Sequence, residues 1–198
     1  MAKLRAPLLS FGASGKLANT LVYFSWKGLE VVRSYVVPAN PNSAAQQTQR
    51  GIFAEAVSSW HTLGLDALDV AAWNRYAATR PDPQSGFNAF VKDFVDLRVS
   101  GVVLADVDMC FNGALVNDGD GTFSGSVETP TGPSQVDMIW GTSPTSLINT
   151  VTDATAPSPW AFAPANNVAG QTIYARFRAE TAGGAARGWS GIYRLVMP

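Results

Sequence analysis

Thr172-Ile-Tyr-Ala-Arg-Phe-Arg-Ala-Glu180 is the stretch that decides the fold of the C-terminal half of this chain. Every second side chain in it is apolar, namely Ile173, Ala175, Phe177 and Ala179. The side chains between them are polar or amphipathic, namely Tyr174, Arg176, Arg178 and Glu180. Because successive side chains of a strand point to opposite faces of a sheet, the pattern predicts a strand with one buried face and one wet face.

The same period of two recurs through the rest of residues 101–198. Further alternating runs lie at Thr122–Glu128, Gln135–Trp140 and Gly188–Val196, and turn sequences such as Asn117–Gly121 separate them. Short strands at this spacing are typical of a sandwich or a barrel. We therefore expect residues 101–198 to form an antiparallel β-sandwich.

The last of these strands carry a family resemblance. Ile173-Tyr-Ala-Arg-Phe-Arg-Ala-Glu-Thr-Ala-Gly-Gly-Ala-Ala-Arg-Gly-Trp-Ser190 resembles the final strand pair of a fibronectin type III domain. That family typically shows a Tyr-x-x-Arg-x-x-Ala run, a Gly-rich loop and then Trp-Ser. The resemblance implies an Ig- or fibronectin-like sandwich, in which Trp189-Ser190 is a packing feature and not a site.

A β-hairpin is expected near the N-terminus, between Asn19 and Pro38. Two β-rich runs flank a turn at Lys27-Gly28, and both faces of the resulting ribbon are largely apolar. A lone two-stranded ribbon cannot hide two apolar faces from water. We expect helices of the same chain to cover one face and a neighbouring subunit to cover the other.

Three helices are expected between the hairpin and the sandwich. Ser43 or Asn42 would begin the first helix, Asp66 or Asp69 the second, and Ser85 the third. Apolar residues recur with helical spacing, namely Ile52, Phe53, Ala56, Val57, Trp60 and Leu63, then Leu68, Val70, Trp73, Tyr76 and Ala77, then Phe87, Phe90, Val91, Phe94 and Val95. The sequence thus predicts an α+β protein, with an arm, hairpin and three-helix module over residues 1–100 and the sandwich over 101–198.

The composition excludes several functional classes. Only 15% of the residues are charged and the net charge is −1, which favours neither nucleic acid nor a membrane as the partner. Residues 1–50 carry six basic side chains against the single acid Glu30, so the N-terminal part suits an acidic protein surface. The low charge indicates either a surface covered by other subunits or a neutral, loop-rich β protein.

The motifs that would indicate catalysis or metal binding are incomplete. Gly12–Leu17 lacks the spacing of a phosphate-binding loop, and Asn117–Gly121 fits a hairpin turn better than a calcium loop, with Asp118 and Asp120 as a weak calcium site at most. His61 and Cys110 are single residues of their kinds, which cannot close a metal site or supply a catalytic pair. We expect Asp66 and Asp69 to be helix caps and Asp106 and Asp108 to lie on a wet strand or linker. No enzyme, cofactor or metal is therefore expected.

The first hundred residues carry a second resemblance. It rests on Gly15-Lys16-Leu-Ala-Asn19-Thr, Val-Val-Arg33-Ser, Asn40-Pro41-x-Ser-x-Ala-x-Gln47-x-x-Arg50, Ala71-Ala-Trp73-Asn-x-Tyr76-Ala and Ser85-Gly86-Phe87-Asn88-Ala-Phe90. This order is similar to that of uncharacterised proteins of tailed bacteriophages and prophages. The resemblance implies a virion structural protein assembled in the host cytoplasm, and the absence of an apolar leader in Met1–Ser10 fits that location.

These inferences lead to one functional expectation and to alternatives. We expect a non-enzymatic capsid decoration protein that forms homo-oligomers and contacts the major capsid protein or other virion subunits. The contact residues expected on the arm and hairpin are Lys16, Tyr23, Phe24, Trp26, Arg33 and Tyr35. The alternatives are a tail, neck or fibre-attachment component, and a module that binds host-surface glycans through exposed aromatic residues such as Trp160 or Trp189.

Overall fold

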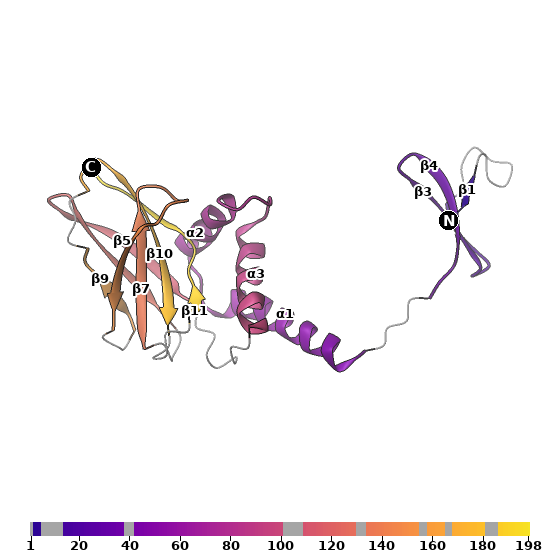
Figure 1. The fold of residues 1–198 in the computed structure, drawn as a ribbon, viewed down its shortest axis with the longest axis horizontal. Helices are drawn as coiled ribbons and strands as arrows, with labels where there is room; N and C mark the ends of the chain where they lie inside the picture. Colours follow the sequence, from indigo (N-terminus) through magenta and orange to yellow (C-terminus); the bar gives the residue numbers. More distant parts are fainter. Residues whose placement is uncertain are drawn as a thin grey trace. The chain divides into compact units, whose positions relative to one another are not determined.

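The protein is an α+β protein in which the described residues form three helices and antiparallel sheets (Figure 1). The computed structural model describes residues 2–4, 14–37, 42–100, 109–129, 134–154, 158–164, 168–180 and 186–198. The chain divides into two compact units, Met1–Ser43 and Ala44–Pro198. No helix in the described ranges is long and apolar enough to cross a membrane.

The described residues of the N-terminal unit form one four-stranded sheet. Its strands are β1 (Ala2–Leu4), β2 (Gly15–Leu17), β3 (Leu21–Trp26) and β4 (Leu29–Ser34), arranged in the order β1-β4-β3-β2. β3 and β4 form a hairpin whose turn lies at Lys27–Gly28, where the sequence places it. Both turn residues have positive φ, 50° and 75°, which is the turn geometry that matches the twist of a hairpin.

The C-terminal unit begins with three helices, which are α1 (Ala44–Thr62), α2 (Ala67–Ala78) and α3 (Gly86–Val99). The predicted helix starts at Asp66 and Ser85 are confirmed. The Asp66 side chain accepts a hydrogen bond from the backbone N–H of Asp69, and the Asp69 side chain accepts one from the backbone N–H of Asp66, which completes a capping box. The Ser85 hydroxyl accepts from the backbone N–H of Asn88.

Aromatic rings from all three helices form a helical core. Phe90 of α3 is fully buried and makes edge-to-face contacts with Trp60 of α1 and Trp73 of α2, with ring centroids 5.1 and 5.2 Å apart. The predicted apolar stripes are nevertheless too wide. Phe53 and Leu68 remain 56% and 60% exposed, because α1 and α2 each bury only part of the stripe.

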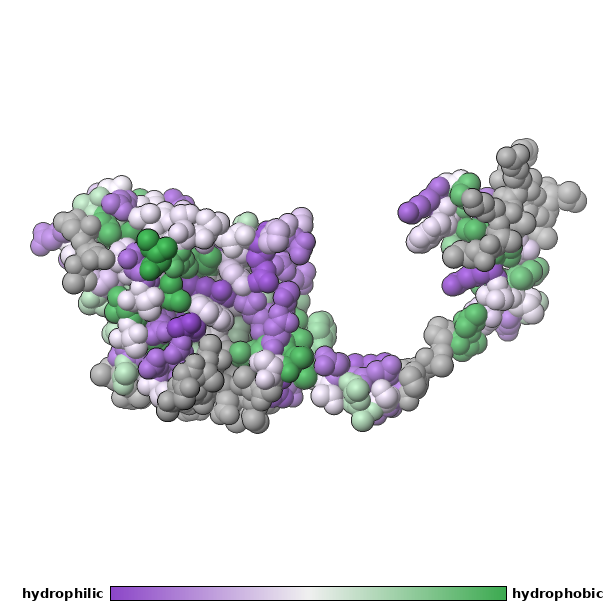
Figure 2. Space-filling model, viewed as in Figure 1, coloured by the Kyte–Doolittle hydropathy of each residue, from purple (hydrophilic) through white to green (hydrophobic). Residues whose placement is uncertain are grey.

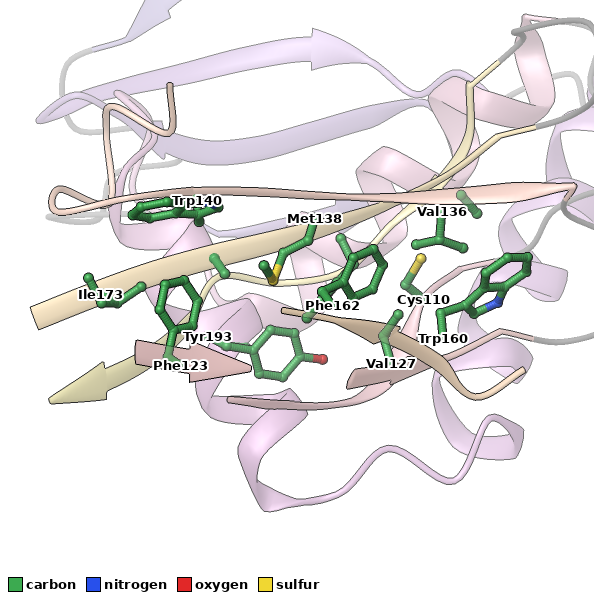
Figure 3. Packing of buried hydrophobic residues seen from close by; sticks show 14 of the residues in the cluster. Cys110, Phe123, Val127, Val136, Met138, Trp140, Trp160, Phe162, Ile173 and Tyr193 are labelled. Carbon is green, nitrogen blue, oxygen red and sulfur yellow. The ribbon is translucent and has the colours of Figure 1, made fainter. Parts of the chain in front are cut away.

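Among the described residues after the helices, eight strands form two sheets that enclose a second core. β7 (Gln135–Gly141), β8 (Asn149–Asp153), β10 (Thr172–Glu180) and β11 (Ala186–Trp189) lie in the order β11-β10-β7-β8, and β12 (Tyr193–Val196) also pairs with β10. β5 (Phe111–Gly119), β6 (Thr122–Glu128) and β9 (Trp160–Phe162) form the other sheet, in the order β5-β6-β9. Figure 3 shows side chains of both sheets meeting in this core, among them Met138, Phe123 and Phe162.

Several sequence predictions for these strands are confirmed. β6 and β10 have the predicted bounds, and the four alternate side chains from Ile173 to Ala179 are fully buried. Asp120–Gly121 forms a tight hairpin turn between β5 and β6, with positive φ at both residues. The predicted run Gly188–Val196 is instead divided between β11 and β12.

The face of β10 that was expected to be wet is covered, which corrects the prediction. The side chain of Arg176 is only 12% exposed. Its guanidinium lies 3.8 Å from the ring centre of Tyr76 on α2, and its Nη2 donates to Asp93 on α3 at 2.9 Å. The helices therefore act as a cover for the outer side of this sheet.

The helices belong with the C-terminal strands and not with the hairpin. α2 contacts β5 and β12, and α3 contacts β11. This differs from the expected module of residues 1–100, in which the helices were to pack on the hairpin and the boundary was to fall between residues 100 and 101. Each helix hides apolar surface against elements that follow it in the chain.

A buried carboxylate, Asp69 of α2, connects the helices to the sheets. Besides closing the capping box, it accepts hydrogen bonds from the backbone N–H of Asn112 at 3.0 Å, from that of Gly113, and from the Tyr193 hydroxyl. The Asp69 side chain has no exposed surface. Burial, followed by the neighbouring Asp69 charge, raises the pKa of Tyr193, so this phenol remains a donor.

Near the hydrogen bonds of Asp69, the backbone before β12 comes very close to the backbone of α2. Gly191 lies against α2 so closely that a Cβ at this position would stand 2.4 Å from Ala72 C and Trp73 N. Ile192 N–H donates to the Ala72 carbonyl at 3.0 Å, which fixes the approach. Only a residue without a side chain fits between α2 and the start of β12.

Replacing the buried carboxylate with an amide should therefore destabilise the unit. Asp69→Asn loses the charge that four donors share, and we expect the free energy of unfolding to fall by about 2–4 kcal/mol. Asp66→Asn is the matched control, because asparagine caps helices as well as aspartate does and Asp66 is exposed. Urea unfolding followed by circular dichroism measures both, and equal effects would contradict the role given to Asp69.

The close approach of Gly191 predicts that two glycine-to-alanine substitutions will change the free energy of unfolding in opposite directions. Gly191→Ala should lower the free energy of unfolding by about 1–3 kcal/mol, because the backbone of α2 cannot move away cheaply. Gly51→Ala, at an exposed position of α1 with open space around it, should raise it by about 0.5–1 kcal/mol. A stabilising Gly191→Ala in the same urea experiment would refute the close approach.

Candidate functional site

The six residues expected to make protein contacts all lie in or next to the N-terminal sheet, and strand register assigns them to faces. Directly paired residues share a face of a sheet. Val22 lies opposite both Lys16 and Arg33, Phe24 lies opposite Val31, and Trp26 lies opposite Leu29. We call this set the cationic face, and it comprises Lys16, Val22, Phe24, Trp26, Leu29, Val31 and Arg33.

Tyr23 lies on the opposite face. It pairs with Val32, and its neighbours on that face are Leu17, Leu21, Ser25 and Glu30. The sequence predicts two apolar faces, and the register adds that they differ in charge. The described cationic side chains at paired positions, Lys16 and Arg33, share one face, and the acid Glu30 occupies the other.

Two cation–π contacts organise the cationic face. The Lys16 ammonium lies 4.5 Å from the ring centre of Tyr35, and the Arg33 guanidinium lies 5.5 Å from that of Phe24. Each contact contributes about 0.5–1 kcal/mol at an exposed site. The rings hold the positive charges near the surface of the sheet without neutralising them, so the charges remain available to an acidic partner.

Large apolar side chains on this sheet are open to solvent. Trp26 is 57% exposed and Leu29 46% exposed, whereas Val31 in the middle of the sheet is buried. The described residues of Met1–Ser43 form this one sheet and provide no second layer to cover it. In Figure 2, hydrophobic and hydrophilic residues lie side by side on this unit.

Sequence reasoning missed two members of this surface, Leu17 and Leu29. Leu17 is 47% exposed on the face of Tyr23, and Leu29 stands beside Trp26 at the turn end of the cationic face. Pairing Leu29 with Trp26 across the Lys27–Gly28 turn could have identified Leu29. Leu17 pairs with Leu21 across the turn at residues 18–20, where Ala18 and Asn19 have positive φ. The hairpin expected from the sequence begins at Asn19, so Leu17 falls outside its strands.

The structure also places the other candidate motifs. Gly15–Leu17 is the extended strand β2, while the residues before Ser14 that would complete a phosphate loop lie outside the described residues. His61 is exposed in the last turn of α1, and Cys110 is buried with its Sγ 3.9 Å from the Gly188 carbonyl. Asp118 accepts a hydrogen bond from Ser124 within the β5–β6 hairpin.

No metal centre is found where the structure describes the chain. Those ranges contain no group of three or more His, Cys, Asp or Glu side chains that could hold an ion. Asp106 and Asp108 lie outside the described residues.

The aromatic residues expected to favour glycan binding serve internal packing. Trp160 is 1% exposed, and its indole N–H donates to the Thr129 hydroxyl at 3.0 Å. Trp189 is half-buried, with its ring 4.5 Å from the Arg176 guanidinium. Trp160 therefore offers no free face on which a sugar could stack, and the Trp189 ring is already in contact with Arg176.

Comparison with protein-family models, curated proteins and solved structures gives no match to this chain. The candidate site is therefore defined by the geometry of the N-terminal sheet alone.

The backbone amides of the N-terminal sheet should be only weakly protected from hydrogen exchange. A small sheet without a second layer opens locally at little free-energy cost, so we expect amides of β3 and β4 to exchange about 100-fold faster than those of β10. Hydrogen–deuterium exchange of the full chain measures both segments in one experiment. Equal protection would mean that the sheet is already covered in the isolated protein.

Proposed function

We propose that this protein is a non-enzymatic bacteriophage virion structural protein, and specifically a capsid decoration protein attached through its N-terminal sheet. The observation that carries the proposal is the exposed cationic face, which bears Trp26 and Leu29 at its turn end and the charges of Lys16 and Arg33 further along the same face. Aromatic and arginine side chains in this arrangement are typical of protein–protein contacts.

The physical basis of attachment is burial of apolar surface guided by charge. The N-terminal unit, Met1–Ser43, has five basic side chains and one acidic one in the sequence, so it is attracted to an acidic subunit surface. Covering Trp26 and Leu29 would supply the apolar contribution. The major capsid protein is the partner that the phage resemblance of the first hundred residues favours.

The C-terminal strands would form the displayed part. We propose that they constitute an Ig- or fibronectin-like sandwich, an assignment supported by the two facing antiparallel sheets and by the motif from Ile173 to Ser190. A tail, neck or fibre-attachment component is the nearest alternative. The glycan-binding alternative loses support from the internal packing of Trp160 and Trp189.

Charge insertion on the cationic face tests the attachment. Trp26→Asp should weaken binding to virions at least about tenfold. It removes a large aromatic contact, and it places a negative charge on the face that is proposed to meet an acidic surface. The measurement is cosedimentation of the purified full chain with virions produced from the same genome without this gene.

Val116→Asp is the matched control, since Val116 is a 54% exposed apolar residue of β5 in the other unit. Its binding should equal that of the unaltered chain. Binding of both variants at full strength would refute attachment through the cationic face. Attachment confined to tails or necks, seen by electron microscopy, would replace the decoration proposal with the tail alternative.

A further inference from the structure

A small pocket lies on the helical side of the C-terminal unit, between the end of α2, the segment from Pro144 to Leu147, and β10. Its volume is 280 Å³, and Tyr76, Thr79, Arg176 and Ile192 line it. The pocket belongs wholly to the C-terminal unit and is separate from the N-terminal sheet.

One arginine lines this pocket, and three others are connected to its wall or share its sheet face. Arg176 lines it directly. Arg80 donates to the hydroxyl of Tyr76, and Arg75 donates to the carbonyl of Ile192, so these two hold residues of the pocket wall. Arg194 pairs with Tyr174 and therefore shares a sheet face with Arg176.

The cluster has too few carboxylates to balance it. Asp93 is shared by Arg80 at 3.3 Å and Arg176 at 2.9 Å. Arg75 and Arg194 have no carboxylate partner among the described residues. This local excess of positive charge is unexpected, because Ala44–Pro198 carries nine basic and fourteen acidic residues in the sequence.

Like charges are also held close together within the cluster. Burial, and then the neighbouring Arg194 guanidinium, lower the pKa of Arg75, while Tyr174 opposes this shift. Burial of Arg75 and repulsion from Arg194 both disfavour the charge of Arg75, and the described ion pairs supply no counter-charge to either residue. An anion in the pocket would relieve both.

Arg176 has hydrogen-bond donors to spare. An arginine offers five N–H groups, and the contacts to Ser190 and Asp93 use two of them. The rings of Tyr76 and Trp189 lie 3.8 and 4.5 Å from its guanidinium and fix its plane. A fixed guanidinium fork with remaining donors is suited to the two oxygens of a carboxylate or phosphate.

We propose that this pocket, walled by Arg176 and flanked by Arg75, Arg80 and Arg194, binds an oxyanion group, either a carboxylate or a phosphate. The proposal is independent of the attachment function, since it concerns the other unit and a different surface. The pocket volume suits a single anionic group, such as an acidic side chain or the acid group of a sugar, better than an extended polymer.

Titration of the full chain tests the proposal. The indole N–H of Trp189 is the reporter, since its ring lies 4.5 Å from the Arg176 guanidinium, and it is followed by NMR with sodium phosphate, sodium acetate and sodium chloride at matched ionic strength. We expect a saturable shift with phosphate, acetate or both, and none with chloride. The anion that shifts the signal identifies phosphate or carboxylate as the preferred group.

Two charge-removing variants complete the test. Arg194→Gln, at an exposed residue, should weaken anion binding about three- to tenfold by removing one cation from the sheet face that carries Arg176. Lys92→Gln removes the same charge from an exposed position of α3 that pairs with Asp96, and should leave binding unchanged. Equal shifts with chloride, or equal losses in both variants, would overturn the proposal.

Discussion

The hydrogen bonds of the Asp69 carboxylate are the constraint on which the C-terminal unit depends. One buried charge caps α2 and also holds the start of β5 and the phenol of Tyr193. A buried carboxylate without donors would be strongly unfavourable, so α2 and both strands have to be in place together. This requirement explains why the helices fold with the strands that follow them.

Other contacts depend on that docking. Once α2 lies against β12, the missing side chain of Gly191 allows the backbones to touch. Tyr76 of α2 can then cover Arg176 of β10, while Asp93 of α3 neutralises part of its charge. The N-terminal sheet has no comparable second layer among its described residues, and its exposed aromatic and cationic side chains suit it to an external partner. The described residues of the C-terminal unit thus cover their own sheets with helices, whereas those of the N-terminal unit leave theirs exposed.

Local features of this protein follow well from its sequence, and long-range features do not. The caps at Asp66 and Ser85, the turn at Lys27–Gly28 and the bounds of β6 and β10 depend on residues a few positions apart, so pattern reasoning finds them. Asp69 reads correctly as part of a helix cap, but its bond to Tyr193 spans 124 positions. The covered side of Arg176 and the pocket beside it likewise require contacts between α2, α3 and β10, which no local pattern contains. In the candidate site, alternation predicts the two apolar faces and puts Arg33 and Glu30 on opposite ones, whereas Lys16 joins the face of Arg33 only through the pairing of β2 with β3.

The short outer strands of the N-terminal sheet have a consequence for how copies of the protein accumulate. β1 and β2 are three residues long and flank the apolar strands β3 and β4, and β2 carries Lys16. Short edge strands with charged side chains disfavour hydrogen bonding to strands of other chains, which is the step that leads to fibrils. The first half of the amyloid-prone segment Leu21–Trp26 is shielded in this way, because β2 pairs with Leu21, Val22 and Tyr23. Strand-by-strand growth of fibrils from copies of this protein is therefore disfavoured at β1 and β2.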